Sequence, residues 1–104
     1  MPTALFVEVD ELVLTADAEG VEMEVAIEED GDAINVWLAS IERTHGRPGA
    51  GARALERLME ICSDHEVPIE GAIEPPNPRL EEYYSMHGFD IERHGSRTII
   101  TRTP

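Results

Sequence analysis

A glycine-rich turn, HGRPGAG at residues 45–51, is the first segment whose residue types suggest chemistry. It follows an apolar run and precedes a helical pattern, so we expect it to join a strand to the first turn of a helix. A helix N-terminus carries unpaired backbone N–H groups and a partial positive charge, and glycines let the backbone approach a phosphate closely. The turn therefore suits a diphosphate.

Two common phosphate-binding motifs do not fit this turn. The GK(S/T) ending of a Walker loop is missing, and the glycine spacing is not that of a Rossmann fingerprint, which also needs a βαβ unit around it. Glycine-rich connections between a strand and a helix also occur without any ligand. From this segment alone, a purely structural turn stays an open alternative.

The elements that must position the turn are predicted from hydrophobic periodicity. Ala4–Val9, Glu11–Leu14 and Val21–Ile27 alternate with period two and are predicted strands, and Ile34–Ile41 is apolar on both faces, as in a central strand. The elements expected around and after them are a turn at Glu29–Asp32, a helix over Ala50–Asp64, a strand at Ile69–Ile73, a loop at Glu74–Pro78, a helix over Arg79–His87 capped by Gly88, and a strand pair at Phe89–Ile91 and Arg97–Arg102. This order predicts one α/β (α+β) domain over residues 1–104, with helices packed on a mixed, largely antiparallel sheet.

The charge of the chain is strongly acidic. There are 22 Asp and Glu residues against 8 basic residues, all of them Arg, which gives a formal net charge of −14. Such a field repels nucleic acid and anionic membranes and attracts cationic partners. A solubilising or salt-adapted surface with a bias towards Arg is the alternative explanation.

Several classes of protein are not expected from this composition. No apolar run reaches the ~20 residues that a membrane span needs, and the start of the chain has no signal-peptide pattern. The single cysteine, Cys62, gives no reason to expect an oxidising compartment, so we expect a cytoplasmic protein. His65, His87 and His94 lack metal-ligand spacing with one another and with Cys62, so no metal site is predicted.

The segment NPRLEEYYSMHGF, at residues 77–89, carries a second set of regularly spaced residues. Asn77 lies seven residues before Tyr84, which lies four residues before Gly88 and five before Phe89. This spacing resembles the N-x-x-A-x-x-F-Y-x-x-x-G-F motif of the GCN5-related N-acetyltransferase (GNAT) superfamily. The resemblance implies a GNAT-like sheet with splayed central strands.

The glycine-rich turn resembles the other hallmark of that superfamily, (R/Q)-x-x-G-x-(G/A), in its second half. Gly46 stands where the superfamily usually has Arg or Gln, and Arg47 is the next residue. The run Arg47–Gly51 is similar to the R-x-G-x-G turn of very small phage members, among them type V anti-CRISPR acetyltransferases that modify a lysine of their target nuclease. The family's usual helix between its first strands is expected to be missing, so the chain resembles a minimal member.

The resemblance implies that acetyl-CoA is the cosubstrate and lies in a gap between Ile34–Ile41 and Ile69–Ile73. The first strand would pair with the pantetheine arm, and the glycine-rich turn would hold the pyrophosphate. The residues that the resemblance implies for acetyl-CoA are Leu38, Ala39, Ser40, Ile41, Arg47, Gly49, Ala50, Gly51, Ala52 and Asn77.

The same resemblance implies that Tyr84 protonates the departing CoA thiolate. A phenol with a pKa near 10 suits this task because it is neutral at pH 7. Tyr84 could instead be a core aromatic residue, with Tyr83 in its role. The amine must lose a proton before attack, and Glu42 is our candidate base, with a chain of water molecules as the alternative.

The activity implied by the resemblance is transfer of an acetyl group from acetyl-CoA to a primary amine. The acceptor would be a cationic amine, either a small molecule or a lysine of a partner protein, and a homodimer would complete the site or the sheet. The alternative is a catalytically inactive GNAT-fold binding module whose acidic surface occludes a basic protein surface.

Overall fold

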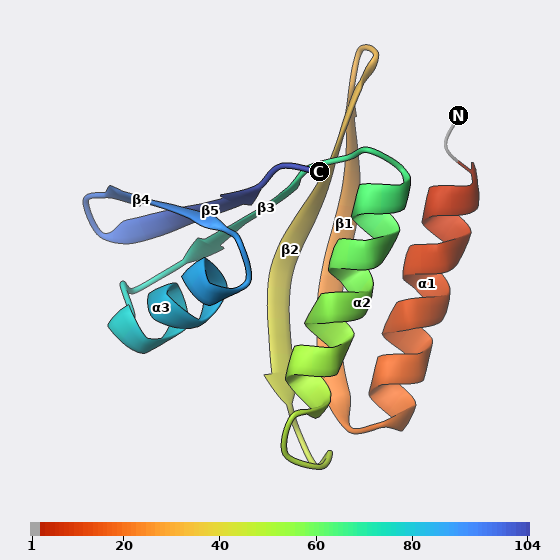
Figure 1. The fold of residues 1–104 in the computed structure, drawn as a ribbon, viewed down its shortest axis with the longest axis horizontal. Helices are drawn as coiled ribbons and strands as arrows, with labels where there is room; N and C mark the ends of the chain where they lie inside the picture. Colours follow the sequence, from red (N-terminus) through yellow and green to blue (C-terminus); the bar gives the residue numbers. More distant parts are fainter. Residues whose placement is uncertain (1–2) are drawn as a thin grey trace.

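The computed structural model describes residues 3–104, which form three helices and five strands (Figure 1). In chain order these are α1 (Thr3–Ala18), β1 (Val21–Asp30), β2 (Ala33–Arg43), α2 (Ala50–Asp64), β3 (Ile69–Ile73), α3 (Pro78–Met86), β4 (Asp90–His94) and β5 (Arg97–Arg102). The predicted α+β class is confirmed. No helix in this part of the chain is long and apolar enough to cross a membrane.

The strands form one mixed sheet in the order β1-β2-β3-β5-β4. Only β2 and β3 run parallel, and every other neighbouring pair is antiparallel. The predicted largely antiparallel sheet is therefore confirmed. The parallel pair is the centre of the sheet, and the connection between its strands is α2.

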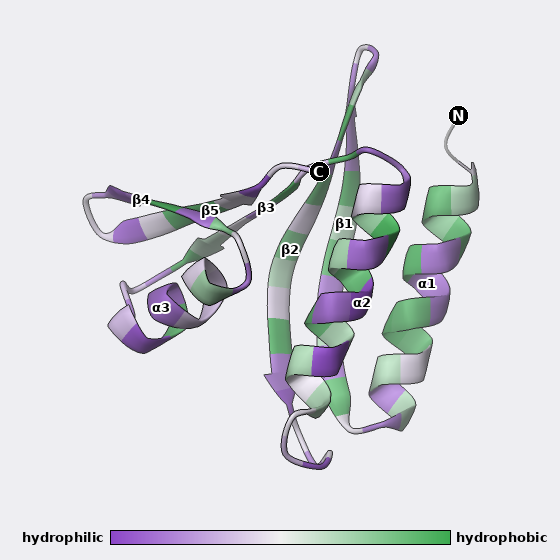
Figure 2. Ribbon diagram, viewed as in Figure 1, coloured by the Kyte–Doolittle hydropathy of each residue, from purple (hydrophilic) through white to green (hydrophobic). Residues whose placement is uncertain are grey.

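The N-terminal segment is a helix, and the strands predicted at Ala4–Val9 and Glu11–Leu14 are wrong. Leu5, Val9, Leu12 and Ala16 are buried at the spacing of one helix face. Val7 and Leu14 are also apolar but lie on the outer face, with exposed fractions of 49% and 71%. Apolar residues on both faces, several of them β-branched, hide the helical period, and Figure 2 shows that α1 is apolar over much of its surface.

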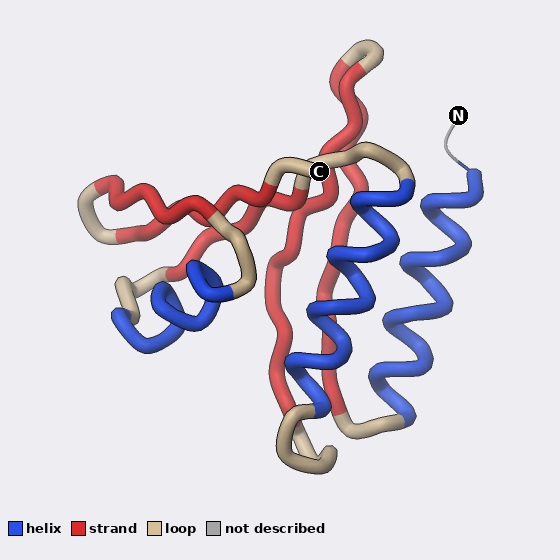
Figure 3. The backbone as a smooth tube through the Cα atoms, viewed as in Figure 1, coloured by secondary structure: helices blue, strands red, loops and turns tan. Residues whose placement is uncertain are grey.

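The core lies between one face of the sheet and the helices. From α2 the buried residues include Leu55, Leu58 and Ile61, and from β1 they include Val21 and Met23. From Val21 to Glu28 the residues of β1 alternate between buried or half-buried and exposed, so only one face of this strand is covered. Figure 3 shows α1 and α2 side by side along β1 and β2.

Strand β2 contains a bulge at the centre of the sheet. Val25 of β1 pairs with Leu38 and Glu24 pairs with Ser40, so Ala39 is an extra residue on β2. The parallel ladder with β3 has its last pair at Leu38, immediately before this bulge. Beyond it β2 continues to Arg43 and no longer pairs with β3, so the predicted splayed central strands are confirmed (Figure 3).

Candidate functional site

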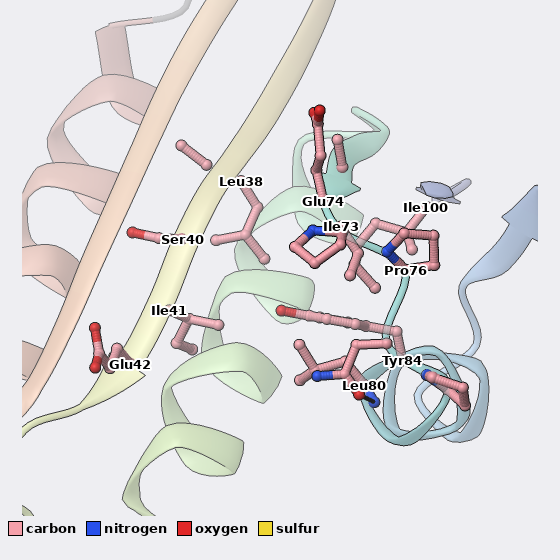
Figure 4. A pocket seen from close by; sticks show the side chains of 15 residues that line it. Leu38, Ser40, Ile41, Glu42, Ile73, Glu74, Pro76, Leu80, Tyr84 and Ile100 are labelled. Atoms are coloured by element: carbon pink, nitrogen blue, oxygen red, sulfur yellow. Dashed lines mark hydrogen bonds between the residues drawn. The ribbon is translucent and has the colours of Figure 1, made fainter. Parts of the chain in front are cut away.

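A cleft of about 640 Å³ lies where β2 and β3 separate (Figure 4). One wall is β2 from Leu38 to Glu42, and the other is the segment Ala72–Pro78, which ends β3 and leads into α3. Leu80 and Tyr84 of α3 also line it. Because β2 is unpaired on this side after Leu38, its backbone groups are available to a ligand in the cleft.

The cleft is lined from both faces of the sheet. Leu38 and Ile41 belong to the face that the helices cover, since they pair with Val25 and Met23 of β1. Ser40 and Glu42 belong to the opposite face, and Figure 4 shows them on the other side of β2 from Tyr84. A ligand bound on the helix side can therefore meet a second molecule that approaches from the opposite face.

Tyr84 extends from α3 across the cleft with its hydroxyl directed towards β2 (Figure 4). Its ring packs edge to face against Phe89, with ring centroids 5.3 Å apart, and against Tyr83, 5.5 Å apart. Burial, and secondarily the neighbouring Tyr83, raises the pKa of Tyr84 to about 12. The phenol therefore carries its proton at neutral pH and has one to donate.

Local contacts at both ends of α3 fix the direction of Tyr84. At the start, the Asn77 side-chain oxygen accepts hydrogen bonds from the backbone N–H groups of Arg79 and Leu80, which makes Asn77 the N-cap. The pair Asn77-Pro78 is a start signal visible in the sequence. After the last turn, Gly88 has a φ of 87°, which allows the chain to reverse and bring Phe89 under the Tyr84 ring.

An ion pair between a buried carboxylate of α3 and an exposed arginine of β4 ties these two elements together. Glu81 is only 5% exposed, and its Oε1 accepts a 2.8 Å hydrogen bond from Nε of Arg93. Its other oxygen, Oε2, has no hydrogen-bond partner among the described residues. The pair holds α3 in place one helical turn before Tyr84.

The glycine-rich turn forms the N-terminus of α2, as predicted. Gly49 is the N-cap residue with a φ of 88°, a conformation that favours glycine, and no side chain caps the helix. The Ala50 N–H donates to Arg47, whereas the N–H groups of Gly51 and Ala52 have no protein acceptor among residues 3–104. Two free amides at a helix N-terminus can hold a phosphate.

A second cavity, of about 210 Å³, connects this turn to the cleft. It is lined by Gly51 on one side, by Ile41 of β2, and by Tyr83 and Tyr84 on the other side. An elongated ligand can therefore reach from the α2 N-terminus to the Tyr84 phenol. Arg43 of β2 and Leu80 of α3 complete its lining.

Packing explains why glycine stands at position 46. Its backbone N–H donates to the Gly20 carbonyl, and a Cβ on Gly46 would clash with the Glu19 carbonyl oxygen. The turn is thus pressed against the connection between α1 and β1. Arg47 lies outside the cleft, in a separate hollow of about 310 Å³ that Arg53, Glu19 and Ala50 also line.

The structure thus distributes the predicted site residues over three adjoining places. The cleft between β2 and β3 is lined by Leu38, Ala39, Ser40, Ile41, Glu42, Asn77 and Tyr84. Gly49, Gly51 and Ala52 form the turn beside it, and Arg47 and Ala50 line the neighbouring hollow. Sequence reasoning missed Glu74, a second carboxylate in the cleft, because no motif marks it before the proline-rich loop.

No sequence family and no curated protein sequence matches the chain. Its structure is similar to that of Arabidopsis thaliana Naa50 in complex with the bisubstrate analogue CoA-Ac-MVNAL, with a TM-score of 0.66 and 14% identity. It is also similar to the PaiA N-acetyltransferase from Thermoplasma acidophilum in complex with coenzyme A, with a TM-score of 0.59 and 14% identity. Each match covers 79% of this chain, but only 64% and 53%, respectively, of those longer chains.

A third similar structure is matched over nearly its whole length. The match to the anti-CRISPR protein AcrVA5 has a TM-score of 0.51 and 16% identity, and it covers 77% of this chain and 97% of that one. Identities this low bear on the fold, and the fold agrees with the predicted resemblance. The chain therefore has the fold of the GNAT acetyltransferases, in a minimal form.

Proposed function

We propose that this chain is an acetyl-CoA-dependent N-acetyltransferase that transfers the acetyl group to a primary amine of a cationic acceptor. The observation that carries the proposal is the position of the Tyr84 hydroxyl, which faces the unpaired part of β2 across the cleft. The free amides of Gly51 and Ala52 support it, because they lie at the other end of a continuous path and suit a pyrophosphate.

The proposed reaction is attack of a neutral amine nitrogen on the thioester carbonyl carbon, with cleavage of the carbon–sulfur bond. Tyr84 donates its phenolic proton to the departing thiolate and regains a proton from solvent. Burial raises the pKa of Tyr84 to about 12, and it acts in the same direction on the pKa of a thiol in the same cleft. The pKa values of the proton donor, the phenol, and of the proton acceptor, the thiolate, therefore shift together.

The proton of the attacking amine must pass to a base on the opposite face. Glu42 is the proposed base because it lines the cleft on that face and is exposed, so it can exchange protons with water. Glu74 lies at the same cleft and is proposed to attract the cationic acceptor. Both carboxylates favour a positively charged amine over an anionic substrate.

Thermal unfolding in the presence of acetyl-CoA tests the binding step. A ligand that binds only the folded state raises the melting temperature, by an amount that grows with concentration. We expect a rise with acetyl-CoA and with CoA, and none with an equal concentration of acetyl phosphate. An unchanged melting temperature at about 1 mM acetyl-CoA would remove the basis of the proposal.

One observation favours a second candidate, a binding module without transferase activity. Gly46 occupies the position where GNAT members usually have Arg or Gln, and Arg47 lies in a hollow outside the cleft. Such a module would occlude a basic protein surface with its acidic field. Incubation with acetyl-CoA and a lysine peptide, followed by mass spectrometry, separates the two, because only the enzyme adds an acetyl group.

A further inference from the structure

One whole face of the sheet is free of helices among residues 3–104. Side chains of a strand alternate between the two faces, so the strand register assigns each residue to a side. Every strand residue that is buried belongs to the face that packs on α1, α2 and α3. On the opposite face the side chains are exposed or half-buried, from β1 at one edge to β4 at the other.

Acidic residues are numerous on this open face. By the register of the sheet it carries Glu22, Glu24, Glu28, Asp30, Glu42, Glu70, Asp90 and Glu92. The strand arginines Arg43, Arg93 and Arg102 lie on the helix-covered face instead, which leaves Arg97, at the β4–β5 turn, as the arginine of the open face in the described strands. The sheet thus separates its charges, and the open face has a strongly negative potential.

Apolar side chains lie among the acids of the open face. Trp37 on β2 and Ile99 on β5 are half-buried. Trp37 pairs with Ala26 on one side and with Glu70 on the other, and Ile99 pairs with Ala72 and with Glu92. Protein–protein interfaces combine apolar contacts with polar and charged ones, and tryptophan is enriched among the residues that dominate their binding energy.

The cleft opens onto this face. Ser40, Glu42 and Ala72 belong to the open face and also line the cleft. Trp37 lies on the same strand as Ser40 and Glu42, so a chain that covers Trp37 extends directly to the cleft. The surface and the site are therefore continuous.

We propose that the open face binds a lysine- and arginine-rich polypeptide segment and presents one of its lysines to the cleft, so that the acceptor is a basic protein. This inference rests on the proposed function and names its substrate class. The charge of the face selects a cationic partner, and its half-buried Trp37 and Ile99 select one with apolar side chains to pack on them, which a small polyamine lacks. The face extends over all five strands, more than a small amine can cover.

Trp37 is the only tryptophan of the chain, so its fluorescence reports binding on the part of the face formed by β2. The probe is a blocked peptide of about 12 residues that alternates Lys with Thr and Leu. When extended, it is longer than the width of a five-stranded sheet whose strands lie ~4.8 Å apart. A peptide with Glu in place of Lys is the control. We expect a saturable change in Trp37 emission with the Lys peptide that weakens as salt is raised, and no change with the Glu peptide.

Two variants with the same change in net charge locate the binding surface. The first neutralises the open face with Glu22→Gln, Glu24→Gln, Glu28→Gln and Glu92→Gln, and leaves Glu70 beside the reporter Trp37 in place. The second neutralises exposed acids on the outer sides of α1 and α2 with Glu11→Gln, Asp17→Asn, Glu60→Gln and Asp64→Asn. We expect the dissociation constant to rise about tenfold in the first and to stay within about twofold in the second.

Three results would overturn the docking surface. The first is an equal rise in the dissociation constant of the Lys peptide in both variants, and the second is no rise in the variant of the open face. The third is a change in Trp37 emission with spermine that equals the change with the peptide at equal charge. Fluorescence anisotropy of a labelled peptide repeats the comparison without relying on Trp37, and circular dichroism checks that both variants are folded.

Acetylation of the same peptide separates this inference from the proposed function. If the peptide binds the open face but gains no acetyl group, the proposed activity fails and the docking surface stands. If both variants acetylate the peptide with an unchanged Michaelis constant, the docking surface fails and the activity stands.

Discussion

Leu38 and Gly71 form the last pair of the β2–β3 ladder, and a Cβ on Gly71 would lie 2.8 Å from the Leu38 carbonyl oxygen. The strands can approach this closely only because position 71 has no side chain. Immediately after this pair, the bulge at Ala39 ends the ladder and the cleft begins. The contact therefore sets the point from which the two walls of the cleft diverge.

Replacing Gly71 with Ala is expected to destabilise the protein. The new Cβ would push the Leu38 carbonyl and the Ile100 side chain apart, and overpacking of this kind costs about 1–3 kcal/mol. Urea denaturation measures the change. Gly51→Ala is the matched control, because a Cβ there meets nothing within 4 Å, and it should not lower the free energy of unfolding. Similar losses in the two variants would contradict the close contact.

Tyr84→Phe is expected to lower kcat by about 10²-fold or more, because it removes the proton donor and keeps the ring that packs on Phe89. The thermal shift with acetyl-CoA should be retained. Tyr83→Phe, on the adjacent residue, should leave kcat within about twofold. Release of free CoA thiol measures both rates. A larger loss in Tyr83→Phe than in Tyr84→Phe would assign the acid to Tyr83.

The two carboxylates of the cleft are expected to differ in their effects. Glu42→Gln removes the proposed base and should lower kcat by about 10²-fold, whereas Glu74→Gln should mainly raise the Michaelis constant for a cationic amine. Steady-state kinetics over a range of amine concentrations separates these parameters. If Glu42→Gln retains the wild-type kcat, water or another group takes the proton.

Arg93→Met is expected to lower the free energy of unfolding by about 1–3 kcal/mol, because it leaves the buried Glu81 carboxylate without its partner. Arg97→Met on the same hairpin, at an exposed position, should change it by less than about 0.5 kcal/mol. The double variant Glu81→Leu, Arg93→Met should recover most of the loss, since no unpaired charge remains. Equal losses in the two single variants would show that the pair contributes nothing.

Stability is expected to fall at alkaline pH, partly through Cys62. Burial raises the pKa of the Cys62 thiol from 9.0 to about 12, against a smaller opposing effect of Arg102. Between these values the unfolded chain loses the thiol proton and the folded chain keeps it, so stability present below pH 9 is lost as pH rises towards 12. In Cys62→Ala the decline should be shallower, because the thiol no longer contributes to it while Tyr83 and Tyr84 still do. Parallel declines would contradict a buried thiol that resists ionisation.

Elements with one apolar face could be predicted from the sequence. The alternation of Val21, Met23 and Val25 gives β1, and the stripe through Leu55 and Leu58 gives α2. Helix α1 could not be predicted in this way, because its exposed Val7 and Leu14 add apolar residues to the solvent face. Its assignment depends on packing against α2 and β1, which a local pattern does not contain.

The candidate site was only partly predictable for a related reason. Tyr84 and the Gly49–Ala52 turn carry local signals, because a helix start and a motif spacing are set by nearby residues. The bulge at Ala39 depends on how β1 pairs with β2, and the place of Glu74 in the cleft depends on where β3 separates from β2. These are relationships between distant segments, so no residue spacing records them.

A crystal structure of the protein with acetyl-CoA is the most direct test of the proposed site. It should place the pyrophosphate on the amides of Gly51 and Ala52, the pantetheine arm between β2 and β3, and the sulfur within hydrogen-bond reach of the Tyr84 hydroxyl. Acetyl-CoA bound elsewhere on the chain, or bound in the cleft with its sulfur away from Tyr84, would contradict the assignment.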